Sequence, residues 1–335
     1  MKQKFHLAAI VGIALAAAVV FALHGVDASA AASFDLAGLS AAGLAFGGMT
    51  WQPAQLDPYQ GSLTGGGRIV NTVPNGYRYH MLRIRYVSTL AGGTAQTVDS
   101  TVMSAELSRI DLKVGTKVQR TYTGETLIML LKFVGGTIQN NFLEIPFYEY
   151  DRNTVNGSEA LAWGTDDLPN PAVRIETTIA ASKYPTVFEV HAERDDANLP
   201  LGAIVKIKET TFNVSAAGDF TYNPDYSSGD KLRRLHIKDS GQISAVLVKA
   251  NNREEVYVTS AVNTQRLKQA TPAFVPQTNW FHLVFDVDHG VFSNLDTVRM
   301  GKDGTARLLA NLAMKFTFGA SGNYTVVEEW IGQRD

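Results

Sequence analysis

The sequence predicts an all-β protein made of two similar β-sandwiches in tandem, preceded by an apolar N-terminal helix. From Trp51 onward, glycine and asparagine turn signals separate short runs that are rich in β-branched and aromatic residues, which is typical of strands joined by tight turns. One order of elements, a strand, a turn, a short helix and a second strand, occurs around residues 103–150 and again around residues 243–288. A repeated supersecondary unit of this kind indicates a duplicated domain.

The first sandwich opens with two predicted strands, residues 68–73 and 77–86, which are joined by a tight turn at Asn75-Gly76. In the second of these strands the apolar residues fall on alternate positions. Arg83 and Arg85 share the other face, so we expect that face to be the one in contact with water.

The repeated unit of the first half begins with a predicted strand at residues 104–114. Leu107 is out of phase with the apolar residues after it, which indicates a bulge or bend near Ser108. A switch to helical spacing predicts a helix over 124–134 with Thr123 or Gly124 as its cap. The remaining strands of this half are expected at residues 142–147, 172–179 and 187–192.

A domain junction is predicted at about residue 198, where Asp195, Asp196, Asn198 and Pro200 follow one another closely. In the second half, a turn at Asn251-Asn252 and a helix over 260–269 repeat the pattern of the first. The strands of this half are expected at residues 203–214, 232–238, 245–250, 281–287, 306–318 and 324–330. The chain would then contain two tandem jelly rolls, 51–198 and 199–335, each with eight strands in two sheets.

The N-terminal 50 residues differ from the rest. Lys2 and Lys4 precede an apolar run of about 17 residues, Leu7 to Leu23, the lower limit for a helix that crosses a bilayer. The run therefore reads either as a membrane helix or as a secretory signal segment with Ala28-Ser29-Ala30 as its cleavage site. The predicted membrane residues are Leu7, Ile10, Val11, Ile13, Leu15, Val19, Val20, Phe21 and Leu23. Residues 31–50 would form a small-residue arm or a flexible linker.

Composition and charge exclude several classes of protein. The 335 residues carry a net charge of −2, whereas nucleic-acid binders usually have a basic stripe. Cysteine is absent, so neither disulfides nor cysteine metal sites can form. A hydrophobic content of 45% is sufficient for a packed core in each half.

The sequence shows no catalytic pattern. None of the seven histidines has the spacing of a metal ligand pair, and His80, His191, His236 and His282 are expected to be strand residues with satisfied hydrogen bonds. Paired carboxylates could serve in glycoside hydrolysis or calcium binding. The calcium candidates are Asp286 and Asp288, although a turn that uses aspartate and glycine for backbone reasons is the preferred explanation. No other cofactor is predicted.

Several short stretches resemble one protein family. They are residues 56–58, 65–79, 109–115, 123–128, 235–241 and 324–330. In order and spacing they are similar to the double jelly-roll major capsid proteins of tailless, membrane-containing icosahedral bacteriophages of the corticovirus type. The likeness spans about residues 56–331, and the long apolar N-terminal extension departs from the family pattern.

The resemblance implies a structural shell protein, not an enzyme. It implies a homotrimer of pseudo-hexagonal outline that tiles an icosahedral shell, with minor capsid or penton proteins as further partners and no direct contact to nucleic acid. The apolar N-terminus suggests a tether to an internal lipid membrane of a virion that assembles in a bacterial host. The alternatives are a secreted bacterial β-sandwich binding module, such as a lectin or adhesin, and a jelly-roll hydrolase.

Overall fold

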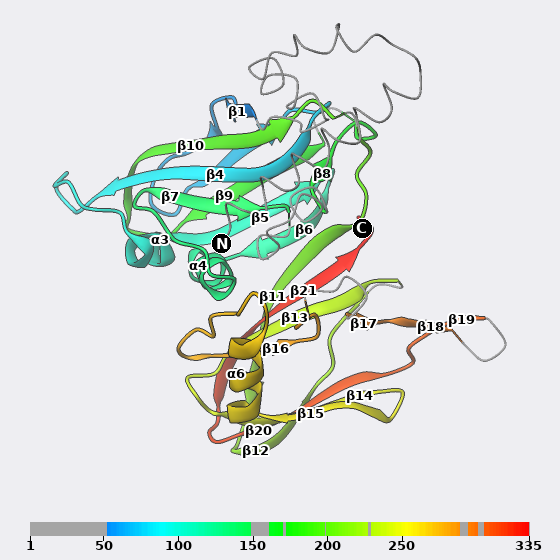
Figure 1. Ribbon diagram of the computed structural model, residues 1–335. Helices are drawn as coiled ribbons and strands as arrows, with labels where there is room; N and C mark the ends of the chain where they lie inside the picture. Colours follow the sequence, from blue (N-terminus) through cyan, green and yellow to red (C-terminus); the bar gives the residue numbers. More distant parts are fainter. Residues whose placement is uncertain are drawn as a thin grey trace, which may run out of the picture. The chain divides into compact units, whose positions relative to one another are not determined.

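The computed structural model describes residues 52–148, 161–169, 172–197, 199–226, 229–288, 294–300 and 305–334. The chain divides into two compact units, Met1–Thr50 and Trp51–Asp335, and every described strand and helix lies in the second (Figure 1). The apolar helix predicted for residues 7–23 lies outside the described residues. The domain boundary at residue 198 is not tested and stays a prediction.

The first half of the second unit is a sandwich of two four-stranded layers. The strands of one layer follow the order β1-β10-β4-β7, with the bounds Gln52–Gln55, Tyr184–Asp195, Arg78–Thr89 and Phe142–Pro146. Those of the other layer follow the order β3-β9-β5-β6, with the bounds Arg68–Val73, Val173–Ile179, Leu107–Val114 and Lys117–Tyr122. The short strands β2 (Gln60–Gly61) and β8 (Trp163–Gly164) extend β3 and β4.

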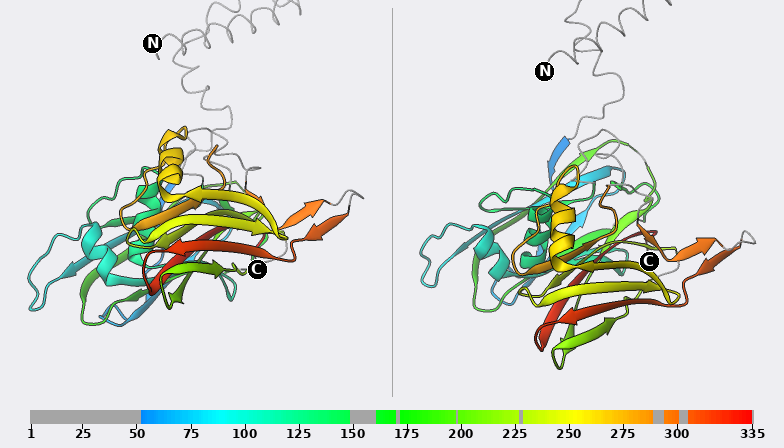
Figure 2. Two further views of the ribbon diagram at one scale, coloured as in Figure 1. Left: turned by 90° about the horizontal axis from the view of Figure 1, so that it is seen from below. Right: turned by 60° about the horizontal axis from the view of Figure 1, so that its bottom comes forward.

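The second half repeats this arrangement strand for strand. One layer has the order β11-β21-β13-β16, with the bounds Ile204–Val214, Gly322–Gly332, Lys231–Lys238 and Trp280–Val284. The other has the order β12-β20-β14-β15, with the bounds Gly218–Tyr222, Leu312–Phe318, Ile243–Ala250 and Arg253–Thr259. Two tandem jelly rolls of eight strands are therefore confirmed. A ribbon of β18 (Val298–Met300) and β19 (Ala306–Leu308), preceded by β17 (Leu295–Asp296), projects from the second one (Figure 2).

The two jelly rolls share one continuous sheet. β6 pairs in parallel with β11 through Arg120 and Ile207, and this contact joins two layers into a ten-stranded sheet. The guanidinium of Arg120 also donates a hydrogen bond of 2.7 Å to the carbonyl of Val205. An edge strand of the first jelly roll is thus covered by the second, which removes an exposed edge.

A β-bulge occurs at the same place in both jelly rolls. In the pairing of β4 with β10, the register shifts at His80, between Tyr79 and Met81. In the pairing of β13 with β21, it shifts at Arg233, between Leu232 and Arg234. His80 lies three positions before Arg83, and Arg233 lies three positions before His236. Because both lie at the same distance from the bulge, Arg83 and His236 are equivalent residues of the two copies.

Three short helices complete the described chain: α3 (Ser100–Glu106), α4 (Gly124–Phe133) and α6 (Ser260–Gln269). The predicted helices of the repeated units are confirmed, but the strand predicted to begin at Ser104 is wrong for its first three residues. The Asp99 side chain accepts hydrogen bonds from the backbone N–H groups of Thr101 and Val102, so it caps a helix that extends to Glu106. The predicted irregularity near Ser108 is confirmed by a register shift between Leu107 and Arg109.

The helices α4 and α6 occupy equivalent positions but differ in burial. α4 is capped by reciprocal hydrogen bonds between Thr123 and Thr126, and it buries residues around its whole circumference. α6 has no side-chain cap and buries only Asn263 and Leu267. A helix that is apolar all round is buried on all sides, and here the second jelly roll covers the side of α4 that faces away from its own sheet. There, Met129 and Phe133 form an apolar cluster with Leu267, Phe274 and Val284.

Candidate functional site

The two calcium candidates lie in different surroundings. Asp286 is buried, and both of its carboxylate oxygens accept hydrogen bonds from arginines: 2.7 Å from Arg233 and 2.9 Å from each of two Arg234 nitrogens. Asp288 is exposed. Among the described residues, no group of three or more histidine, aspartate or glutamate side chains could hold a metal ion. A calcium ion at Asp286 would compete with two guanidinium groups, and its binding there stays a prediction.

The nine predicted membrane residues, from Leu7 to Leu23, lie outside the described residues. Within the part of the chain that the structure does describe, no helix has both the length and the apolar character needed to span a bilayer. The membrane prediction is therefore untested.

Each strand histidine has a polar partner, as expected. His80 contacts the Asp195 carboxylate at 2.6 Å, and Arg78 donates to the same oxygen at 2.7 Å. His191 lies 3.4 Å from Glu189. Both groups join a carboxylate to basic side chains inside or on the first jelly roll.

The other two histidines form a connected network that the sequence did not reveal. His236 on β13 and His282 on β16 are directly opposite each other, and their Nδ1 atoms are 2.7 Å apart. The other ring nitrogen of His236 lies 2.8 Å from Glu329 of β21. All three side chains are buried. We call this group the covered triad, because α4 of the first jelly roll lies over it.

The hydrogen bonds determine the tautomers of the covered triad. The backbone N–H of Gln277 donates to Nε2 of His282, so that nitrogen has no proton. His282 then donates from Nδ1 to Nδ1 of His236, and His236 donates from Nε2 to the Glu329 carboxylate. Every nitrogen and the carboxylate oxygen have a partner, which is the condition for a buried polar network to be stable.

Electrostatics support this assignment. Burial and the neighbouring His236 lower the pKa of His282 well below its usual value, so its ring is neutral near pH 7. Burial by itself would raise the pKa of Glu329, but Arg234, the hydrogen bond from His236 and Arg233 outweigh it and lower that pKa to about 2. Arg233 and Arg234 together therefore compensate two carboxylates, those of Glu329 and Asp286.

Aromatic rings connect the covered triad to α4. Phe133 stacks on the His282 ring with the ring centres 4.3 Å apart, and on Phe274 at 4.9 Å. Arg234 lies 4.8 Å over the Phe274 ring. The triad thus belongs to the surface by which the second jelly roll contacts the first.

The first jelly roll has an equivalent triad whose three side chains are partly exposed. Arg83 occupies the position of His236, and it contacts Glu193 at 3.0 Å and Glu144 at 2.9 Å. Glu193 and Glu144 occupy the positions of Glu329 and His282, as the shared register shows. We call Glu144, Arg83 and Glu193 the open triad.

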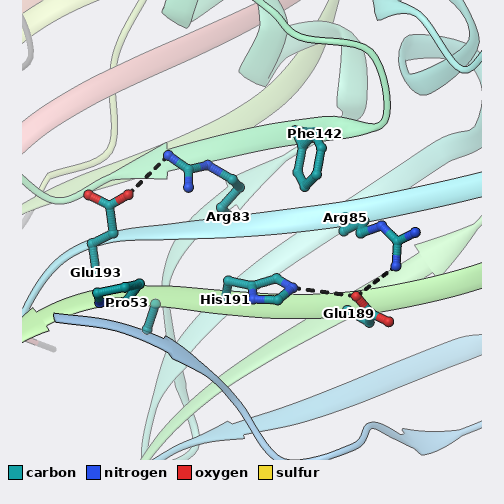
Figure 3. Close-up of a pocket in the computed structure, with 8 residues that line it drawn as sticks. Pro53, Arg83, Arg85, Phe142, Glu189, His191 and Glu193 are labelled. Carbon is teal, nitrogen blue, oxygen red and sulfur yellow. Dashed lines mark hydrogen bonds and ion pairs between the residues drawn. The ribbon is translucent and has the colours of Figure 1, made fainter.

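A surface hollow of about 320 Å³ is lined in part by Arg83 and Glu193 of the open triad. Figure 3 shows its lining: Arg83 with Glu193 on one side, and Arg85, Glu189 and His191 on the other. Arg85 lies 3.0 Å from Glu189, and its hydrogen bond lowers the pKa of that carboxyl. The hollow is lined by paired charges, which suits a protein surface better than a small apolar ligand.

Nearly all of the described chain matches one protein family. The family model of the viral coat protein P2 N-terminal domain matches residues 53–195, and that of the P2 C-terminal domain matches residues 204–334. A comparison with curated protein sequences finds no match. The family does not favour the secreted binding module considered as an alternative.

Solved capsid proteins share the fold at low sequence identity. The major capsid protein P2 of bacteriophage PM2 is 14% identical with a TM-score of 0.71, over 85% of this chain and 98% of that one. A capsid model of the virus PBCV-1 is 10% identical with a TM-score of 0.57, over 84% and 94%. A structure of Sulfolobus turreted icosahedral virus is 11% identical with a TM-score of 0.59, over 85% and 91%. Two family models that follow each other along nearly all described residues, on a duplicated jelly roll, lead to one conclusion: this chain belongs to the viral coat protein P2 family, and it is a structural capsid protein with the double jelly-roll fold, not an enzyme.

Proposed function

We propose that this chain is the repeating subunit of an icosahedral virion shell and that it associates with itself as trimers of pseudo-hexagonal outline. The observation that supports this most is the strand-for-strand duplication. Each chain contributes two jelly rolls of the same design, so three chains around one axis would present six similar units. Closed rings of identical chains are the common solution for homo-oligomers.

The proposal extends to the N-terminus. Residues 7–23 are apolar and follow two lysines, a pattern that suits a helix anchored in a membrane with its charged end on one side. We propose that this segment contacts an internal lipid membrane beneath the shell, in a virion that assembles inside a bacterial host. Minor capsid or penton proteins would complete the shell where trimers alone cannot fill it.

The oligomeric state of the full-length chain tests the first part. Light scattering after size-exclusion chromatography in mild detergent should give the mass of three chains, and electron microscopy should show particles with a six-sided outline. A chain that stays monomeric at every concentration tested would overturn the proposal.

Lipid flotation tests the membrane part. The full-length chain should float with liposomes, and Ile13→Asp should reduce flotation because a charge at the centre of a membrane helix costs about 3 kcal/mol. Ser33→Asp, which lies outside the apolar run, is the control. Equal flotation of both variants and the unaltered chain would argue against insertion of residues 7–23.

A further inference from the structure

We propose that a cavity between the two jelly rolls of one chain binds a monovalent anion, a halide ion such as chloride, and that Arg120 holds it. The cavity has a volume of about 70 Å³. It lies where α4 and β6 of the first jelly roll meet β11, β13 and β21 of the second (Figure 1). The site belongs to a single chain, so it does not depend on how chains associate.

Arg120 is a buried arginine whose described partners are all uncharged. It is 2% exposed. Its Nε donates to the carbonyl of Val205 at 2.7 Å, and its Nη1 donates to the carbonyl of Pro146 at 2.7 Å and to the hydroxyl of Tyr122 at 3.4 Å. Within the described ranges of the chain, no carboxylate forms an ion pair with it. An arginine remains charged when it is buried, and a buried charge is costly unless an opposite charge compensates it.

The guanidinium of Arg120 is held in a fixed position. Its central carbon lies 5.1 Å from the centre of the Phe147 ring and 5.3 Å from that of Trp163. The two backbone carbonyls engage Nε and Nη1, whereas Nη2 donates to no oxygen of the described residues. Because Arg120 lines the cavity, Nη2 is the donor that a ligand there can use. A donor that is already positioned loses little side-chain entropy when a ligand binds.

The buried charges around the cavity leave one positive charge over, within the part of the chain that the structure describes. Arg233, Arg234 and Glu329 also line the cavity. Asp286 accepts hydrogen bonds from both of these arginines, and both arginines lower the pKa of Glu329 to about 2, so that it stays ionised. Two arginines thus match two carboxylates, and the charge of Arg120 is the one that remains. A single negative charge in the cavity would compensate it.

The lining favours a small monovalent anion. The α4 side chains of Leu127, Leu130 and Leu131 form an apolar part of the wall, where an ion with two charges would be costly to desolvate. Burial raises the pKa of Tyr122, so its phenol is neutral near pH 7 and can donate a hydrogen bond to an anion. About 10–15 Å³ is enough for one water molecule, so the cavity has room for a halide ion with water beside it.

A bound anion would contact both jelly rolls, because Arg120 belongs to β6 and Arg234 belongs to β13. A ligand that binds the folded chain but not the unfolded chain stabilises the fold as its concentration rises. We therefore expect halide ions to stabilise the docked pair of jelly rolls.

Thermal unfolding of the full-length chain in mild detergent tests the site. Sodium bromide replaces sodium gluconate at constant total salt, since gluconate is a large polar anion that does not suit this cavity. Above the dissociation constant of bromide, each tenfold rise in its concentration should raise the melting temperature by about 3 °C. Arg120→Met should abolish this increase. Arg253→Met, the same change at an exposed arginine, is the matched control and should keep it.

Anomalous diffraction locates the ion directly and does not require the variant to fold. Crystals of the unaltered protein grown in sodium bromide should show a bromide peak in the cavity beside the Arg120 guanidinium. A cavity without a peak would overturn the inference. Equal bromide-dependent increases in melting temperature for the unaltered chain and a folded Arg120→Met would also overturn it, and so would a peak without any stabilisation, which would mark an adventitious ion only.

Discussion

Replacing Glu329 by glutamine keeps the shape of the side chain and removes the charge that faces His236 and Arg234. When one partner of a buried ion pair is removed, the other is left uncompensated, at a cost of about 3–5 kcal/mol. The pKa of Glu329 gives a second route: a fall from 4.5 to about 2 corresponds to roughly 3 kcal/mol, since each tenfold change in an acid constant is worth about 1.4 kcal/mol. We expect Glu329→Gln to lower the free energy of unfolding by about 3 kcal/mol.

The duplication of the fold supplies a matched control. Glu193→Gln makes the same change at the equivalent position of the open triad, where Arg83 keeps Glu144 and both side chains of the pair are partly exposed. The expected cost is about 1 kcal/mol or less. Urea denaturation of subunits dissociated to monomers, followed by tryptophan fluorescence at pH 7, measures both. Equal costs for the two variants would refute the argument that burial under α4 makes the difference.

A low pH should destabilise the folded protein through the same residue, Glu329. Because the pKa of Glu329 is lowered in the folded protein, its contribution is complete above about pH 4.5 and is lost as the pH falls toward about 2. The unaltered protein should lose stability across that window, and Glu329→Gln should lose about 3 kcal/mol less. Parallel acid profiles of the two proteins would contradict this account of the network.

Three further measurements follow from the structure. The pKa of His282 is lowered in the folded protein, so in acid the unfolded chain binds a proton that the folded chain does not. The melting temperature should therefore decrease as the pH is lowered from about 6.5, and it should decrease less in His282→Phe. Equal slopes of melting temperature against pH for the two proteins would contradict this. Thr123→Ala should cost about 1 kcal/mol by removing a helix cap, whereas Thr259→Ala, at a helix start without a side-chain cap bond, should change stability little; equal losses would be the contrary outcome. If Asp286 and Asp288 bind calcium, a chelator should lower the melting temperature, and Asp288→Asn should abolish that effect; an unchanged melting temperature would remove the calcium prediction.

The alternation of apolar residues made most strands predictable, but several escaped detection, among them β6, β12 and β15. β15 has mostly exposed residues, because it is a sheet edge, so it lacks the alternation that marks a half-buried strand. β6 buries Gln119, Arg120 and Tyr122, polar residues that face the contact between the jelly rolls. A local pattern expresses neither the position of β15 at the end of its sheet nor the contact of β6 with the second jelly roll.

The covered triad escaped prediction for a different reason. His236 and His282 were correctly expected to be satisfied strand residues, but their partners are 46 and 93 positions away in the chain. Only the register of three strands brings these residues together. Asp286 was singled out from the sequence as a possible metal ligand. Its partners Arg233 and Arg234 are brought to it by a β-bulge that no sequence pattern marks. Local chemistry was predictable, whereas long-range pairing was not.

The two triads differ in a way that fits the history of their surfaces during assembly. The covered triad uses two neutral histidines and one glutamate, whereas the open triad uses an arginine between two glutamates. A surface that is covered during folding never needs to be soluble, and neutral rings cost less to desolvate than ions. A surface that meets its partner only after synthesis must remain soluble as a separate subunit, and paired charges achieve this while they discourage wrong contacts. Divergence of the two copies at these three positions is therefore what we expect if one layer binds within the chain and the other binds between chains.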